Sequence, residues 1–284
     1  MKDNKIAKNY HLKIGDKLMD FSIPKVMGII NLTPDSFYDG GKYQAKQNLI
    51  KKIKQLQSED VDIIDVGGVS TRPMAKEVDE EVELQRVIPA IRLIKKHFVD
   101  AIISIDTYRA NVAEKAIKEG AHIINDISGG RFDNNMFKTV AELDVPYVLM
   151  HSRGTPQTMQ SLVNYSNVTT DVIKELSFSI NKLRELGVKD ILIDPGFGFA
   201  KTMEQNYELF KNLEHLHVLD CPLVVGVSRK SMIYKLLNTN PKKALNGTAV
   251  LNTVALIKGA KVLRVHDIKE AKEVVKLTQA LISS

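Results

Sequence analysis

The feature of this sequence that most constrains its fold is a short apolar, β-branched run that recurs eight times, each time followed by a polar turn and a helical stretch. Apolar runs without polar alternation are typical of strands buried on both faces, as in a parallel sheet with helical crossovers. No Ser/Gly-rich linker or shift of composition divides the 284 residues. The runs occupy residues 26–33, 61–68, 101–107, 122–128, 145–151, 191–197, 222–228 and 261–267.

Eight strand–helix units in one domain favour a closed barrel over an open doubly wound sheet. The sequence therefore predicts an α/β fold, a single (β/α)8 TIM barrel, over residues 26–284, preceded by an N-terminal extension of residues 1–25. Within the extension, residues 12–14 and 18–23 can pair as a short β-hairpin that covers the bottom of the barrel.

Helical periodicity separates the apolar runs. Pro89 predicts a kink or break in one of these helices. Gly120 and Gly187 fall where helix C-caps are expected. The clearest helical segments are 78–97, 111–119 and 269–282.

Composition excludes several classes of protein. The N-terminus has no apolar core of a secretory signal, and no apolar stretch is long enough to span a membrane. The net charge of +6 is spread along helices and mixed with acids, so a nucleic-acid partner is not expected. The single cysteine, Cys221, cannot form an internal disulfide and is expected to be buried at the barrel bottom. We therefore expect a cytoplasmic protein.

Polar residues interrupt the apolar runs close to their C-terminal ends. Any one of them can be a cap or a hydrogen-bond partner of a neighbouring loop. Their repetition at equivalent places favours an active site, because sites in (β/α)8 barrels are built on the C-terminal face. These residues are Asn31, Asp65, Asp106, Asn125 with Asp126, His151, Asp194, and Arg264 with His266.

The segments after the strands add further polar groups. Residues 31–43 form a long turn-rich loop, and residues 67–75 carry two hydroxyls and Arg72. Residues 226–231 place Ser228 and Lys230 at a strand-to-helix turn that suits an anion. The G-x-G of residues 194–201 lacks the full dinucleotide fingerprint, and the chain has no Walker A motif, zinc-ligand spacing or nucleophile elbow.

Taken in order, these segments resemble the dihydropteroate synthase family of pterin-binding enzymes. The resemblance runs from about residue 26 to the C-terminus. It implies that para-aminobenzoate displaces pyrophosphate from 6-hydroxymethyl-7,8-dihydropterin diphosphate in an SN1-like step, giving 7,8-dihydropteroate for folate biosynthesis. It also implies Mg²⁺, a homodimer and sulfonamide sensitivity. The fragments that carry it are GIINLTPDSFYDGG, IDVGGVSTRP, ISIDTYR, INDISGG, LMH, IDPGFGFAK, GVSRKSMI and RVHD.

The resemblance implies a role for each matching residue. The catalytic residues are Arg72, Lys230, Asp106 and Asp35, with Phe37 moving in the same loop as Asp35. The pterin-binding residues are Asp106, Asn125, Met150, Asp194, Gly226 and Lys230, although Met150 is equally explained as core. The para-aminobenzoate residues are Thr71, Pro73, Phe199 and Ser228. The pyrophosphate residues are Asn31, Thr71, Arg72, Arg264 and His266, with Asn31 also the Mg²⁺ ligand.

Three positions depart from the family pattern. Val69 stands where many members have Glu, Ala200 where many have Gly, and Met74 where many have Gly. Two other functions remain open. A methyltetrahydrofolate-dependent methyltransferase shares a pterin-binding barrel but has no need of the 70–73 and 228–230 segments, and a non-catalytic pterin-binding paralogue has no need of Arg72 or Lys230.

Overall fold

Eight parallel strands form a closed ring in the computed structural model, which describes residues 10–15, 17–32, 42–70 and 78–283. The ring follows the order β8-β7-β6-β5-β4-β3-β10-β9. A bridge between Ile193 and Leu223 joins β8 to β9 and closes it. The predicted barrel is therefore confirmed. The strands are β3 (Lys25–Asn31), β4 (Ile63–Gly67), β5 (Ile103–Asp106), β6 (Ile123–Asp126), β7 (Tyr147–Met150), β8 (Ile191–Asp194), β9 (Val224–Val225) and β10 (Val262–Val265).

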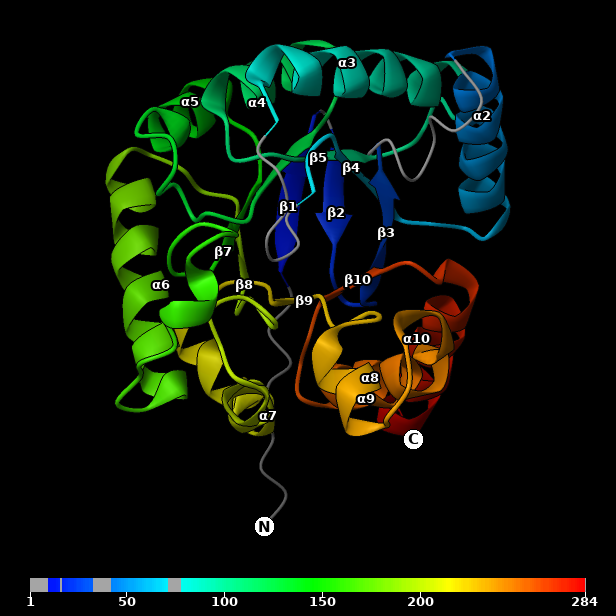
Figure 1. Cartoon of the computed structure of the whole chain (residues 1–284). Coiled ribbons are helices and arrows are strands. Elements are labelled where there is room, and N and C mark those ends of the chain that lie inside the picture. Colours follow the sequence, from blue (N-terminus) through cyan, green and yellow to red (C-terminus); the bar gives the residue numbers. More distant parts are fainter. Residues whose placement is uncertain (1–9, 16, 33–41, 71–77, 284) are drawn as a thin grey trace.

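Helices surround the strands as an outer ring (Figure 1). Apolar side chains of the outer strand faces pack against them and form the larger hydrophobic core. No helix among the described residues has the length and apolar character needed to cross a membrane. The α-helices are α2 (Lys42–Ser58), α3 (Glu80–His97), α4 (Ala110–Lys118), α5 (Met136–Leu143), α6 (Val168–Glu185), α7 (Met203–Lys211), α8 (Ser231–Leu236), α9 (Leu245–Ile257) and α10 (Ile268–Ser283).

Details of the prediction differ from the structure in two places. The helix α3 is continuous from Glu80 to His97, so the predicted break at Pro89 does not occur. The run 222–228 forms a strand of only two residues, and Pro222, which has no N–H to donate, lies before it. Gly120 and Gly187 follow helices with positive φ angles of 105° and 87°, as expected for C-caps. Cys221 is buried, as predicted.

The N-terminal hairpin closes the bottom of the barrel. Strands β1 (His11–Ile14) and β2 (Lys17–Asp20) pair antiparallel, which confirms the predicted hairpin. Their apolar side chains join a second core inside the ring, made with residues near the start of the barrel strands. This inner core consists of Leu12, Ile14, Met19 and Phe21 from the N-terminal segment, and Met27, Ile63, Ile123, Val148, Leu192, Val224 and Val262 from the barrel.

We expect Leu12→Ala to destabilise the protein by about 2–3 kcal/mol, since it removes a buried side chain from a core that cannot fully collapse. Leu18→Ala in the same hairpin is the matched control, because Leu12 is 2% exposed and Leu18 is 72% exposed. The control should change the free energy of unfolding by no more than about 0.5 kcal/mol. Chemical denaturation measures both, and equal losses would show that the hairpin does not seal the barrel.

Side-chain alternation decides which strand residues reach the barrel interior. Ile63, Ile123, Leu192 and Val262 belong to the inner core, and the residue after each of them packs in the outer core. Because successive side chains point to opposite faces of a strand, the next residue faces inward again. Those next residues are Asp65, Asn125, Asp194 and Arg264. The polar layer therefore lies directly above the apolar inner core.

Candidate active site

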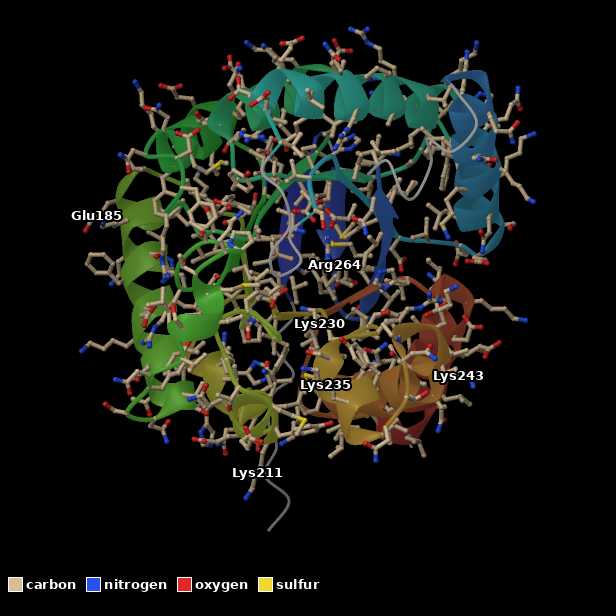
Figure 2. All side chains as sticks on the ribbon, viewed as in Figure 1. Glu185, Lys211, Lys230, Lys235, Lys243 and Arg264 are labelled. Carbon is tan, nitrogen blue, oxygen red and sulfur yellow. The ribbon has the colours of Figure 1, made fainter. Side chains whose placement is uncertain are left out.

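Arg264 on β10 is the centre of the polar layer. Its Nε donates to Asp65 Oδ2 at 2.7 Å, and its Nη2 donates to Asp106 Oδ2 at 2.6 Å. Asn125 Nδ2 donates to the same Asp65 oxygen at 3.1 Å. Strands β4, β5, β6 and β10 thus hold four functional side chains in one hydrogen-bonded group. Figure 2 shows Arg264 and Lys230 near the middle of the ring of helices, with Glu185, Lys211 and Lys243 at its periphery.

Lys230 and Asp194 complete this layer on the side of β8 and β9. Lys230 Nζ donates to the Phe197 carbonyl at 2.5 Å and lies 5.0 Å from the centre of the Phe199 ring. Asp194 Oδ1 accepts the backbone N–H of Gly196 at 2.7 Å. Its other carboxylate oxygen, Oδ2, lies on the side of Gly226.

Gly226 keeps the space between these groups open. A methyl group at its Cα would lie 3.7 Å from Asp194 Oδ2, 3.7 Å from Arg264 Cβ and 3.8 Å from Lys230 Nζ. The carboxylate, the arginine and the lysine therefore converge on the volume above this glycine. Five of the six predicted pterin-binding residues lie in this layer or border it, as the contacts above show: Asp106, Asn125, Asp194, Gly226 and Lys230. The sixth, Met150, is 4% exposed and follows inward-facing Val148 by two residues, so it also faces the interior.

Burial perturbs the charges of the layer. It raises the pKa of Asp106 to about 7, against the opposing effect of Arg264 and with a contribution from Asp65. Burial also raises the pKa of Asp194, which Lys230 partly offsets. The pKa of Lys230 falls to about 8 through burial, opposed by Asp194. Shifted acids and bases that share one cavity are typical of active sites.

The shift of Asp106 predicts how stability depends on pH. Its folded-state pKa of about 7 exceeds its ordinary value of 3.8, so the folded state binds the proton more tightly. The free energy of unfolding should therefore fall as pH rises from about 4 to about 7, by up to about 1.4 kcal/mol per pH unit. Denaturation at several pH values should show a shallower fall for Asp106→Asn, whereas Asp100→Asn on the surface should match the wild type. Identical slopes for all three proteins would contradict the assignment.

Two of the predicted pyrophosphate residues, Asn31 and His266, line one cavity of about 520 Å³. This cavity is bounded by α2, through Lys52, and by α10, through Lys269, and Arg264 does not line it. Ser228 Oγ lies 3.0 Å from His266 Nδ1 and accepts the His266 backbone N–H at 3.2 Å. The structure thus connects Ser228, predicted for para-aminobenzoate, with His266, predicted for pyrophosphate. Asp35, Phe37, Thr71, Arg72, Pro73 and Met74 lie outside the described residues.

The segment between β8 and α7 carries Phe199 beside Lys230. Ala200 in this segment has a φ of 47°, a conformation that favours glycine. Gly196 also has a positive φ, and a Cβ there would meet the His151 carbonyl oxygen at 1.9 Å, so this position requires glycine.

Sequence reasoning assigned no role to two buried residues. Asp65, one of the predicted strand-end residues, is fully buried and hydrogen-bonded to both Arg264 and Asn125. Strand alternation explains its place in the layer, since it follows inward-facing Ile63 by two residues. Lys201 is 5% exposed and hydrogen-bonded to the β8–α7 segment, and nothing in its sequence position distinguishes it from a surface lysine.

Alternation also separates two neighbouring polar residues of β6. Asn125 faces the interior, whereas Asp126 accepts the Tyr147 hydroxyl at 2.7 Å and the backbone N–H groups of Ser128 and Gly130. Tyr147 packs in the outer core. Asp126 therefore supports the loop after β6 and does not reach the barrel mouth.

Comparison with known proteins identifies the family of this chain. The family model of pterin binding enzymes matches residues 27–266. The dihydropteroate synthase of Clostridium beijerinckii is 43% identical over 277 residues, which cover 95% of this chain and 99% of that protein.

Two solved structures share the fold over nearly the whole chain. The Yersinia pestis dihydropteroate synthase with a sulfonamide drug complex is 37% identical with a TM-score of 0.89, covering 96% of this chain and 99% of that one. The Xanthomonas albilineans dihydropteroate synthase with 4-aminobenzoic acid is 34% identical with a TM-score of 0.90, covering 98% of this chain and 100% of that one. The chain therefore belongs to the pterin-binding enzyme family and, within it, to the dihydropteroate synthases.

Proposed function

We propose that this enzyme condenses para-aminobenzoate with 6-hydroxymethyl-7,8-dihydropterin diphosphate, releasing pyrophosphate and 7,8-dihydropteroate. The observation that carries the proposal is the convergence of Asp194, Arg264 and Lys230 on the space above Gly226. Membership of the dihydropteroate synthases supports the same reaction.

Pterin recognition would use the rigid strand residues. The aminopyrimidinone edge of a pterin presents adjacent N–H donors, and a carboxylate accepts such a pair well. Asp194 is the acceptor in this proposal, with Asn125 and Asp106 on other ring nitrogens and Lys230 on the ring carbonyl. Asp65 would act indirectly, because its hydrogen bonds fix Arg264 and Asn125.

The departing pyrophosphate is strongly anionic, and positive charge stabilises it as the C–O bond breaks. Arg264 uses Nε and Nη2 for Asp65 and Asp106, which leaves Nη1 for a substrate oxygen. His266 and Asn31, which line the cavity beside α2 and α10, are proposed to bind the pyrophosphate as well. Arg72 and Thr71 are proposed as further contacts from the second loop. In the SN1-like step, the electrons of the pterin ring stabilise the cationic exocyclic methylene until the amine attacks.

Asn31 fits a magnesium site of the kind that is completed by substrate. The amide oxygen is a ligand type that Mg²⁺ accepts, and Mg²⁺ in phosphate chemistry is usually held by few protein groups, several waters and the phosphates. No cluster of three or more His, Cys, Asp or Glu suited to a metal occurs among the described residues, which agrees with so small a protein contribution. When bound there, Mg²⁺ would neutralise charge on the diphosphate.

Para-aminobenzoate would bind beside Phe199 and Ser228, with Thr71 and Pro73 closing the site. The aromatic amine is neutral near pH 7, so the attack requires no strong base. Asp35 is proposed to act from the first loop when it closes over the substrates. The solved relative with 4-aminobenzoic acid supports this choice of second substrate, and the relative with a sulfonamide supports sulfonamide binding.

We also propose a homodimer and a cytoplasmic location. Val250 and Ile257 lie two helical turns apart on α9, so they share one face, and they are 55% and 60% exposed. Exposed apolar side chains gathered on one surface are typical of protein contacts. Sedimentation should give about twice the 31.8 kDa of one chain.

Mass spectrometry of the products tests the function. Incubation with both substrates and Mg²⁺ should yield dihydropteroate, and methyltetrahydrofolate with a methyl acceptor should yield nothing. Methyl transfer would instead support a methyltransferase, and pterin binding without any product would support a non-catalytic paralogue.

A further inference from the structure

Lys201 forms a buried contact that the catalytic proposal does not use. Its Nζ lies 3.0 Å from His151 Nδ1 and donates to the carbonyl oxygens of Gly196 at 3.0 Å and Phe199 at 3.1 Å. An ammonium group has three N–H donors, so these three acceptors satisfy it completely. The side chain therefore ties the β8–α7 turn, residues 195–200, to the end of β7.

The turn needs such support. Gly196, Gly198 and Ala200 all have positive φ angles, of 69°, 80° and 47°. Side chains from outside the turn hold it: Lys230 binds the Phe197 carbonyl, Tyr165 the Ala200 carbonyl at 2.9 Å and Asn206 the Gly198 N–H at 2.7 Å. Lys201 holds two further carbonyls of the turn, those of Gly196 and of Phe199 itself.

A series of side-chain contacts behind His151 positions the imidazole that Lys201 contacts. His151 Nε2 lies 3.3 Å from Glu175 Oε2 on α6. Glu175 is also paired with Arg131 at 3.0 Å and with Arg153. Burial lowers the pKa of His151 to about 4, which keeps the imidazole neutral and its Nδ1 free to accept from Lys201.

Burying Lys201 is costly. Desolvation lowers its pKa to about 7, and a charge removed from water costs several kcal/mol unless it is compensated. The contacts of Lys201 with His151, Gly196 and Phe199 compensate this cost, and they place its Nζ against the turn that carries Phe199.

We propose that Lys201 is a positioning residue that sets the Phe199 ring for the second substrate, so that it governs para-aminobenzoate binding without touching it. This inference rests on the proposed function. Asp106, Asn125 and Asp194 stand on strands, whereas Phe199 stands on the turn itself. The turn also touches Asp194 through the Gly196 N–H and Lys230 through the Phe197 carbonyl, but it carries no pterin residue of its own. Loss of Lys201 should therefore disturb the second substrate far more than the pterin.

The test compares Lys201→Met and Lys201→Gln with wild type and with Lys235→Met, an exposed control on α8. Because misplacement of a contact by about 1 Å costs up to about 100-fold, we expect the KM for para-aminobenzoate to rise by about tenfold in Lys201→Met and less in Lys201→Gln. The affinity for the pterin should stay within about threefold of wild type, because the substitution leaves the proposed pterin-binding side chains in place and distant sites contribute independently to the binding free energy. Lys235→Met should match the wild type.

A double-mutant cycle with Phe199→Ala separates positioning from general loosening. If Lys201 acts through Phe199, Lys201→Met should not raise the KM further in the Phe199→Ala background. An additive effect, an unchanged KM, or parallel losses for both substrates would overturn the inference. If Lys201→Met does not fold, Lys201→Gln is judged by the same criteria. A wild-type enzyme that makes no dihydropteroate would instead overturn the proposed function.

Discussion

Asp194→Asn is expected to lower kcat/KM for the pterin substrate by about 1,000-fold, or about 4 kcal/mol. The carboxylate is buried, and its remaining oxygen faces the space above Gly226. Asparagine keeps the size and one acceptor but replaces the other oxygen with a donor. That donor would face the N–H groups of the pterin, so one hydrogen bond is lost and two donors are left opposed.

Steady-state kinetics and calorimetric titration with the pterin measure this effect. Asp100→Asn is the matched control, because the Asp100 side chain is 85% exposed. A loss of less than about tenfold in Asp194→Asn would contradict its role, since a charged hydrogen bond contributes more than about 1.5 kcal/mol.

Arg264→Met is expected to destabilise the protein by about 3–5 kcal/mol, because it leaves Asp65 and Asp106 buried without their cation. Burial alone would lower the pKa of Arg264, but Asp65 and Asp106 hold it above its ordinary value, so the guanidinium stays charged. Its loss should also make stability fall more steeply with rising pH, because Arg264 no longer opposes the rise in the pKa of Asp106.

Denaturation of two further variants completes this test. Arg92→Met removes an ion pair with Glu119 in which Arg92 is 63% exposed, and it should cost no more than about 1 kcal/mol. Adding Asp106→Asn to Arg264→Met should restore part of the lost stability, because one uncompensated charge disappears. Equal losses in Arg92→Met and Arg264→Met would mean that the buried cluster is not held by charge.

The eight apolar runs predicted the barrel because burial on both faces leaves a clear pattern. They overestimated the length of β9, which spans only Val224–Val225. Pro89 did not break α3 because packing of a long helix overrides a local preference. The polar strand ends also predicted which face carries the site. Periodicity could have gone further: it separates Asn125 from Asp126 and brings Asp65 into the layer.

Other features depend on contacts that sequence spacing does not record. Lys201 is buried only because the β8–α7 turn folds back onto β7 and places His151 against it. The pairing of Arg264 with two aspartates from different strands likewise requires the closed ring. In both cases residues that are 50 or more positions apart are brought together by the barrel. The family resemblance assigned roles to Arg264 and Asp106 without showing these partners, and it assigned none to Lys201 or Asp65.

The most direct test of the central claim is the rate of pyrophosphate release, measured with and without para-aminobenzoate at saturating pterin diphosphate. A synthase built on this polar layer should release pyrophosphate with para-aminobenzoate present, one equivalent for each dihydropteroate formed. No release under either condition, with the pterin still bound, would show that the barrel binds a pterin without acting on it.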